Sequence, residues 1–132
     1  PRLRRAAPQA GSGIEDWDPS GRAWEADFAN RFVGGGVLSS GCVQEEIRFA
    51  LSPELITACA LAERLEAGES LLIVGALRFS RYTGYADSFA FAGGYDDAGP
   101  GCTITVMDAL KFYDYGSQFS RLAILRELGK AR

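Results

Sequence analysis

The sequence contains no histidine among its 132 residues. This absence excludes Ser-His-Asp and Cys-His catalysis and removes the most frequent ligand of zinc sites. Cysteine is scarce as well: Cys42, Cys59 and Cys102 are odd in number, widely spaced and form no CxxC pair. Their spacing indicates neither a disulfide framework nor a metal site. It favours reduced thiols in an intracellular protein, in the cytoplasm or the nucleus.

Long apolar runs and an excess of positive charge are also missing. No segment approaches the roughly 20 apolar residues of a membrane-spanning helix, and no signal peptide is recognisable, so we expect no membrane partner. The net charge is −3, from 14 basic and 17 acidic residues. A phosphate-bearing ligand would therefore have to be recognised by local groups rather than by an overall positive field.

The only basic cluster lies at the N-terminus, in Arg2, Arg4 and Arg5, and is followed by Gly11-Ser12-Gly13. We interpret residues 1–13 as a flexible basic segment rather than as a nucleic-acid-binding patch. Direct binding of nucleic acid is therefore not expected. Residues 14–132 then remain as one small domain.

Strand-like and helix-like segments alternate through this domain. Hydrophobic patterns predict strands at Arg22–Phe28, Ser70–Ala76 and Cys102–Ala109, and helices at Cys42–Ala50, from Pro53 to a C-cap at Gly68, and at Ser117–Leu128. In the first strand we expect Trp24, Ala26 and Phe28 to face the core. The apolar run of the second strand is typical of a strand buried on both faces. The alternation predicts an α/β architecture with a mixed sheet.

The most informative stretch runs from Ala26 to Ile56 and reads ADFANRFVGGGVLSSGCVQEEIRFALSPELI. Its glycine triplet, residues 34–36, permits positive φ angles and lets a ligand approach the main chain. Free N–H groups in such a turn, or at the following helix start, favour an anionic or hydroxyl-rich ligand. Glu45 and Glu46 follow at the head of a helix, and paired carboxylates are the groups that glycosidic-bond chemistry uses.

The order DFANRFV, GGG, seven residues, QEE and IRFALSPELI closely resembles the signature of the poly(ADP-ribose) glycohydrolase family. The resemblance extends from Ile14 to Ala131 and implies a macrodomain-like three-layer α/β/α fold with a mixed sheet. Sequences of the family continue into further strands and a second glycine-rich loop that wraps the diphosphate. We therefore expect residues 14–132 to be the front portion of the catalytic domain, truncated on the C-terminal side. Full ligand binding would then need the missing C-terminal part.

The same resemblance implies an enzyme that cleaves the ribose–ribose O-glycosidic bonds of poly(ADP-ribose) and releases ADP-ribose, with no cofactor and no metal. Glu46 would protonate the leaving ribose oxygen and then activate water, whereas Glu45 would position the terminal ribose. The other residues that the resemblance implies for substrate binding are Ile14, Glu15, Asp27, Asn30, Gly34, Gly35, Gly36, Gln44 and Tyr85.

Within this set the implied roles differ. Ile14 and Glu15 match an adenine-recognition dipeptide, and Tyr85 matches a tyrosine that packs over the bound ligand. Gln44 and Asn30 match residues that order the ribose and the catalytic loop.

Structural alternatives stay open for these residues. Both glutamates also complement a helix dipole, Asn30 suits a turn at a strand end, Tyr85 suits a core position, and Ile14 and Glu15 suit a surface turn. The pKa of Glu46 is open as well. Burial against Phe32 and Val33 and the charge of Glu45 would raise it, whereas a helix N-terminus would lower it.

Two classes of function remain from the sequence: the glycohydrolase, and a module that binds ADP-ribose without turnover. The presence of both glutamates favours the enzyme, because a pure binding module has no need of the acid. A dinucleotide-binding oxidoreductase is disfavoured, because the chain lacks G-x-G-x-x-G after its first strand and the acidic residue at the expected distance.

Overall fold

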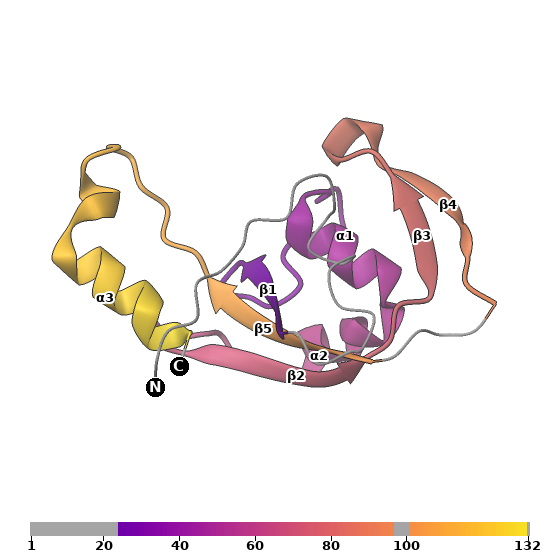
Figure 1. Ribbon diagram of the computed structural model, residues 1–132, viewed down its shortest axis with the longest axis horizontal. Helices are drawn as coiled ribbons and strands as arrows, with labels where there is room; N and C mark the ends of the chain where they lie inside the picture. The colour runs from indigo at the N-terminus through magenta and orange to yellow at the C-terminus, as the bar shows by residue number, and fades with distance from the viewer. Residues whose placement is uncertain (1–23, 97–100, 132) are drawn as a thin grey trace, which may run out of the picture.

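A three-stranded mixed sheet lies at the centre of the computed structural model, which describes residues 24–96 and 101–131 (Figure 1). Strand β1 (Trp24–Ala29) pairs in parallel with β5 (Cys102–Asp108), and β2 (Ser70–Ala76) pairs antiparallel with the other side of β5. Strands β3 (Ser80–Thr83) and β4 (Ala90–Gly94) form a separate antiparallel hairpin. The predicted α/β architecture with a mixed sheet is confirmed. The N-terminal segment 1–13 lies outside the described residues.

The helical segments lie on one face and at one end of this sheet (Figure 1). Helices α1 (Gln44–Leu51) and α2 (Ile56–Leu61), joined by the 3₁₀ turn η2 (Pro53–Leu55), cover one face. Helix α3 (Arg121–Lys130) lies at one end, after the short turn η4 (Ser117–Phe119), and a third turn, η3 (Ala86–Ser88), joins β3 to β4. Among the described residues, no helix combines the length and the apolar character needed to cross a bilayer.

The hydrophobic core forms between α1, α2 and the covered face of the sheet. Its buried members come from both layers and are Ala29, Val33, Phe49, Leu55, Leu65, Ala76, Ile104 and Val106. Burying these side chains supplies the main favourable term for this arrangement. The core therefore holds α1 against the strands that flank the candidate site.

Strand β1 turns the opposite face to the core from the one that we predicted. Trp24 and Phe28 are 63% and 57% exposed, whereas Asp27 and Ala29 are buried. The parallel register explains this, because Asp27 lies opposite Val106, which is itself buried on the core side of β5. The period-2 pattern located the strand, but its larger apolar side chains lie on the exposed face.

Strand β2 has the predicted bounds, but the prediction that both faces are buried was wrong. It is an edge strand of the sheet. Leu71 and Ile73 pack against the core, whereas Leu72 and Val74 are exposed. Successive side chains of a strand point to opposite faces, so the continuous apolar run has one covered side and one open side.

Two helices, α2 and α3, have boundaries that differ from the predicted ones. The second helix ends at Leu61 rather than near Gly68, and Leu65 then donates its N–H to the Arg31 carbonyl at 2.8 Å. The last helix is capped by Ser120, whose hydroxyl accepts from the Ala123 N–H. It continues through Gly129 to Lys130, because the glycine lies within the helix instead of ending it.

Gln44 connects the start of α1 to the edge of β1 that faces away from β5. Its Oε1 accepts from the Phe28 N–H at 2.9 Å, and its Nε2 donates to the Ala26 carbonyl at 2.9 Å. Because β5 is the one strand that pairs with β1 among the described residues, the amide gives partners to two backbone groups on the opposite edge of β1. This connection places the first turn of α1 beside the end of β1.

Replacing Gln44 by alanine should therefore destabilise the fold. Two hydrogen bonds to backbone groups are lost, and we expect the free energy of unfolding to fall by roughly 1–3 kcal/mol. Denaturant unfolding followed by circular dichroism measures this change. Gln118→Ala is the control, because Gln118 makes one local hydrogen bond, to the Tyr115 carbonyl, and its loss should matter much less. Equal stability of the two variants would contradict the proposed connection.

Candidate active site

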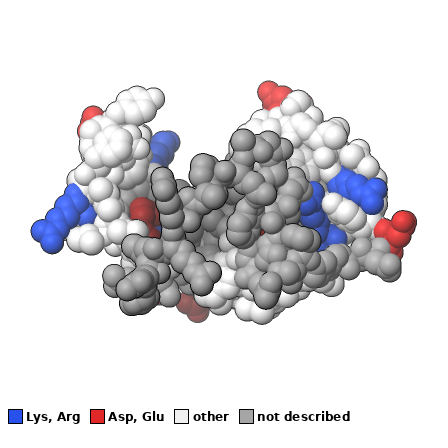
Figure 2. All heavy atoms as spheres, viewed as in Figure 1, with Lys and Arg blue, Asp and Glu red and all other residues white. Residues whose placement is uncertain are grey.

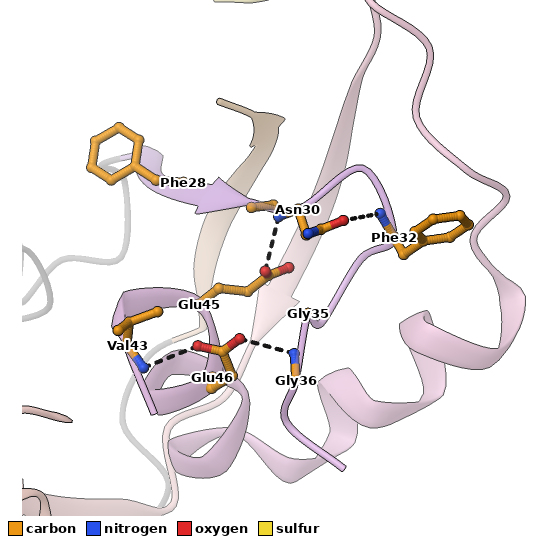
Figure 3. Close-up of a pocket in the computed structure, with 9 residues that line it drawn as sticks. Phe28, Asn30, Phe32, Gly35, Gly36, Val43, Glu45 and Glu46 are labelled. Atoms are coloured by element: carbon orange, nitrogen blue, oxygen red, sulfur yellow. Dashed lines mark hydrogen bonds between the residues drawn. The ribbon is translucent and has the colours of Figure 1, made fainter. Parts of the chain in front are cut away.

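A pocket of about 420 Å³ opens between the end of β1, the loop at residues 34–41 and the start of α1 (Figure 3). We call residues 34–41 the glycine loop. The pocket lies at the carboxyl end of a parallel strand, where α/β domains commonly bind ligands. Its lining residues are Phe28, Ala29, Asn30, Phe32, Gly35, Gly36, Val43, Glu45 and Glu46.

Glu45 uses both carboxylate oxygens to hold the backbone between β1 and the glycine loop. One oxygen accepts from the Asn30 N–H at 2.9 Å and the other from the Gly34 N–H at 2.6 Å. The residue is buried. Hydrogen bonds from backbone N–H groups to a carboxylate are charge-assisted and stronger than neutral ones. Glu45 is therefore a structural anchor of the loop as well as a wall of the pocket.

Glu46 makes the second connection, one step further along the loop. Its Oε1 accepts from the Gly36 N–H at 2.9 Å, and its Oε2 accepts from the Val43 N–H at 3.0 Å (Figure 3). The bond to Val43 is that of a capping box, in which a glutamate in the first helical turn satisfies the N-cap N–H. Both glutamates thus have a structural role, because they lie in the first turn of α1 and accept backbone N–H groups. Both also line the pocket.

Two glycines leave room for the carboxylates. A Cβ on Gly35, whose φ is +50°, would lie 2.5 Å from the Glu46 Oε1 and 2.6 Å from the Glu45 Oε2. A Cβ on Gly41 would lie 2.7 Å from the Glu46 carboxyl carbon. The oxygens of both glutamates therefore converge on one point beside Gly35. No other residue type fits between them without displacing a carboxylate.

Asp27 lies behind this pair, on the core side of β1, and is 0% exposed. Neither of its carboxylate oxygens has a hydrogen-bond partner among the described residues. Burial, with the charges of Glu45 and Glu46 added, raises the pKa of Asp27 to about 7. A carboxyl group in such surroundings is stabilised in its protonated form.

The pKa values of the two glutamates diverge. Burial raises the pKa of Glu45, and the N–H groups of Asn30 and Gly34 offset only part of this effect. Burial also acts to raise the pKa of Glu46, but the backbone N–H groups that it accepts from, led by those of Gly36 and Val43, outweigh burial and lower it. The backbone N–H groups therefore outweigh burial at Glu46 and favour its ionised form in the free chain.

The other residues implied by the resemblance lie at different distances from the pocket. Asn30 lines it, and its Oδ1 accepts from the Phe32 N–H at 3.1 Å, as in the turn that was the alternative for this residue. Gln44 does not line the pocket and holds β1 instead. Tyr85 lies in the β3–β4 connection with 53% of its surface exposed, so the alternative of a core tyrosine was wrong. Ile14 and Glu15 lie outside the described residues.

Sequence reasoning missed part of the pocket wall. Phe28 was expected in the core, yet it lines the pocket together with the exposed Phe32, and the two flank the carboxylates in Figure 3. Val33, also expected to cover Glu46, belongs to the core cluster. Gly41 was missed as well, although a lone glycine close before an acidic helix start is a signal of close packing.

Comparisons with known proteins agree on one family. Residues 8–132 match the family described as "Poly (ADP-ribose) glycohydrolase (PARG), Macro domain fold". The chain is 46% identical over 121 residues to "Poly(ADP-ribose) glycohydrolase 1" of Arabidopsis thaliana, an alignment that covers 86% of this chain and 22% of that protein. It is 40% identical over 116 residues to "Probable poly(ADP-ribose) glycohydrolase 2" of the same plant, covering 83% and 22%. The chain thus spans about a fifth of the length of these relatives.

A further relative comes from an animal. The chain is 48% identical over 68 residues to "Poly(ADP-ribose) glycohydrolase 1" of Caenorhabditis elegans, covering 52% of this chain and 9% of that protein.

Gly35→Ala tests whether the carboxylates depend on the missing Cβ. The added methyl group meets both glutamates, so we expect a loss of stability about 1 kcal/mol larger than backbone strain alone explains. Gly75→Ala is the control for backbone strain, because the φ of Gly75 is +80° and its Cβ would meet nothing within 4 Å. Thermal unfolding of both variants gives the comparison, and Gly35→Ala should lose more stability although its φ of +50° is the less strained. A Gly35→Ala variant more stable than Gly75→Ala would show that the carboxylates are not tightly held.

Asp27→Asn should change how stability depends on pH. The folded-state pKa of about 7 lies above the ordinary value of 3.8, so the folded state loses stability as the pH rises from about 4 through about 7. The variant lacks this loss and should be the more stable protein at about pH 8, by up to a few kcal/mol, and nearly equal to the parent at about pH 4. Unfolding curves across this range decide it, and parallel pH profiles of the two proteins would contradict the raised pKa.

Proposed function

The chain belongs to the poly(ADP-ribose) glycohydrolase family, and on this premise we propose that it contributes the catalytic carboxylates of a poly(ADP-ribose) glycohydrolase. The reaction is hydrolysis of the O-glycosidic bond between two ribose units, which releases ADP-ribose. Glu46 serves as general acid and base, and Glu45 orients the terminal ribose. The observation that carries the proposal is the convergence of the two carboxylates in one pocket beside Gly35.

The position of Glu46 suits both halves of the reaction. In the first half, a proton passes from Glu46 to the leaving ribose oxygen while the glycosidic bond breaks and an oxocarbenium-like sugar forms. In the second half, the Glu46 carboxylate accepts a proton from the water that attacks the anomeric carbon, which restores the acid. The two steps together consume one water and return Glu46 to its starting state.

The lowered pKa of Glu46 in the free chain places a condition on this scheme. An ionised carboxylate stabilises a positively charged sugar and can activate water, but it cannot protonate the leaving group. A bound ligand changes this balance, because it excludes water from the pocket and so raises the cost of ionising the carboxyl group. We therefore infer that Glu46 takes up its proton as the substrate enters.

The pocket walls support a sugar substrate. The exposed rings of Phe28 and Phe32 offer apolar faces to a ribose or a base, while the carboxylates can accept hydrogen bonds from ribose hydroxyls. We assign this positioning role to Glu45, whose oxygens are fixed by Asn30 and Gly34.

A second candidate function is binding of ADP-ribose without turnover. It is favoured by the hydrogen bonds that already occupy both oxygens of each glutamate, and by the lowered pKa of Glu46. A binding module needs the carboxylates only as anchors of the glycine loop. The two functions differ in one respect that can be measured: only the enzyme needs Glu46 to carry a proton.

Glu46→Gln separates the two functions. Glutamine keeps the shape of the side chain but cannot transfer the proton, so in an active protein turnover of poly(ADP-ribose) should fall by about 10²–10⁴. Binding of ADP-ribose, measured by calorimetry, should fall much less than turnover, because glutamine still accepts one of the two backbone N–H groups that Glu46 holds. Glu54→Gln is the control, because Glu54 also accepts a backbone N–H, from Leu77, but does not line the pocket.

Two results would count against the enzyme. Turnover within threefold of the parent protein would remove Glu46 from the mechanism. Tight binding of ADP-ribose by a parent protein that shows no turnover would support the binding module instead.

A further inference from the structure

Two arginines and two tyrosines form a compact group on the β3–β4 hairpin, away from the residues that line the pocket. We call Arg78, Arg81, Tyr82 and Tyr95 the arginine–tyrosine cluster. The Arg81 guanidinium lies 4.6 Å from the centre of the Tyr95 ring, and the Arg78 guanidinium lies 5.7 Å from the same ring. Arg78 also lies 5.8 Å from the Tyr82 ring. Tyr95 thus holds two cations near its ring by cation–π attraction.

The guanidinium of Arg81 is available to a ligand. The residue is exposed, and no carboxylate among residues 24–96 and 101–131 forms an ion pair with it. The acidic residues of the hairpin, Asp87 and Asp96, are not paired with it either. Figure 2 shows basic side chains gathered over the region of β3 and β4. Asp87 and Asp96 balance the charges of Arg78 and Arg81 over the hairpin as a whole, so its positive charge is confined to the two guanidinium groups.

The cluster is also held in a defined geometry. Arg78 donates from Nε to the Ser80 carbonyl at 3.3 Å, and the Tyr82 ring packs 5.7 Å from the Phe89 ring. A guanidinium that is already oriented loses less conformational freedom when it binds a ligand. These contacts therefore favour a binding surface over a pair of freely rotating side chains.

The hairpin is attached directly to the helix that carries Glu45 and Glu46. Phe79 donates its N–H to the Leu51 carbonyl at the end of α1, at 2.9 Å, and Tyr95 donates its N–H to the Phe79 carbonyl at 3.0 Å. Figure 1 shows β3 beside α1. The hairpin is therefore fixed to the C-terminal end of α1, and the pocket lies at the N-terminal end of the same helix. A long ligand bound in the pocket can extend towards the hairpin.

We propose that the arginine–tyrosine cluster binds the diphosphate groups of poly(ADP-ribose) units that lie outside the pocket. This inference rests on the proposed function, because the polymer in that reaction carries a diphosphate in every unit. Guanidinium groups pair with phosphate oxygens in a bidentate manner. The exposed ring of Phe91 can stack with the adenine of the same unit.

The cluster would distinguish a polymer from a single ADP-ribose. A free ADP-ribose fills only the pocket and gains nothing from a second anion-binding surface. A polymer gains contacts from both surfaces at once, which raises its affinity and slows its release. Single-stranded RNA shares phosphates and bases with the polymer, but it has no terminal ribose–ribose linkage to place in the pocket.

Binding measurements in the Glu46→Gln background, where hydrolysis is suppressed, test the proposal. Arg81→Gln should weaken binding of uniform poly(ADP-ribose) chains by roughly 10- to 100-fold, the range for a lost charge-assisted contact. In this variant, the slope of log affinity for the polymer against log salt concentration should become shallower by about 0.7 for each phosphate contact that is lost. Affinity for ADP-ribose itself should not change. Arg121→Gln is the matched control, since it removes an exposed positive charge at the start of α3.

Arg81→Lys refines the test. It keeps the charge and therefore most of the salt dependence, but it loses the planar fork, so polymer affinity should fall to an intermediate level. Thermal melts of all variants confirm that each is folded.

Four results would overturn the proposal. The first is unchanged polymer affinity in Arg81→Gln, and the second is an equal loss of affinity for ADP-ribose, which would place Arg81 at the cleaved unit. The third is an equal loss of polymer affinity in Arg121→Gln, which would indicate a diffuse electrostatic field, and the fourth is equal, Arg81-dependent binding of poly(A) RNA.

Turnover is measured separately in the parent chain. Arg81-dependent polymer binding without turnover would contradict the glycohydrolase but support this surface, and Glu46-dependent turnover with Arg81-independent binding would do the reverse.

Discussion

Four backbone N–H groups converge on the carboxylates of Glu45 and Glu46, and the shape of the pocket depends on these hydrogen bonds. They fasten the irregular segment after β1 to the first turn of α1, which Gln44 in turn fastens to the edge of β1. Each bond satisfies a backbone donor and a buried carboxylate together, so neither is left unpaired in the interior. Gly35 and Gly41 leave the space that the two carboxylates need.

The same hydrogen bonds determine how protons are distributed among the acids. Glu46 accepts enough backbone N–H groups to stay ionised despite its burial. Asp27 has no such partner among the described residues and is buried behind the pair, so near neutral pH it is the carboxyl group that most readily holds a proton. Three carboxyl groups can therefore lie close together without three full negative charges. This arrangement keeps one of the three, Glu46, as a carboxylate.

Local patterns were sufficient to predict much of the fold. The strands Ser70–Ala76 and Cys102–Asp108 and the helix that begins with Gln44 follow from apolar runs and from an acidic helix start. The face of β1 that packs against the core could not be predicted from these patterns. Its largest apolar side chains, Trp24 and Phe28, lie on the exposed face, and Asp27 lies on the buried one. Hydrophobicity located this strand but could not identify its buried face, because that face carries an acid.

The candidate site was also only partly predictable from local sequence patterns. The GGG and QEE motifs identified several of its residues, but they did not reveal the contacts that these residues make. The sequence does not reveal that Gln44 completes a strand edge, that Phe28 lines the pocket, or that backbone N–H groups outweigh burial at Glu46. These depend on the parallel register of β1 with β5 and on the path of the glycine loop, which are set by tertiary packing.

The central claim is that ADP-ribose occupies the pocket whose wall these hydrogen bonds build. A titration of the ¹⁵N-labelled chain with ADP-ribose, followed by NMR, tests it most directly. We expect saturable shifts of the backbone amide signals of Asn30, Gly34, Gly36 and Val43, because a ligand beside the carboxylates alters the hydrogen bonds that these amides make. Unchanged signals at these four positions, with shifts confined to other parts of the chain, would contradict it.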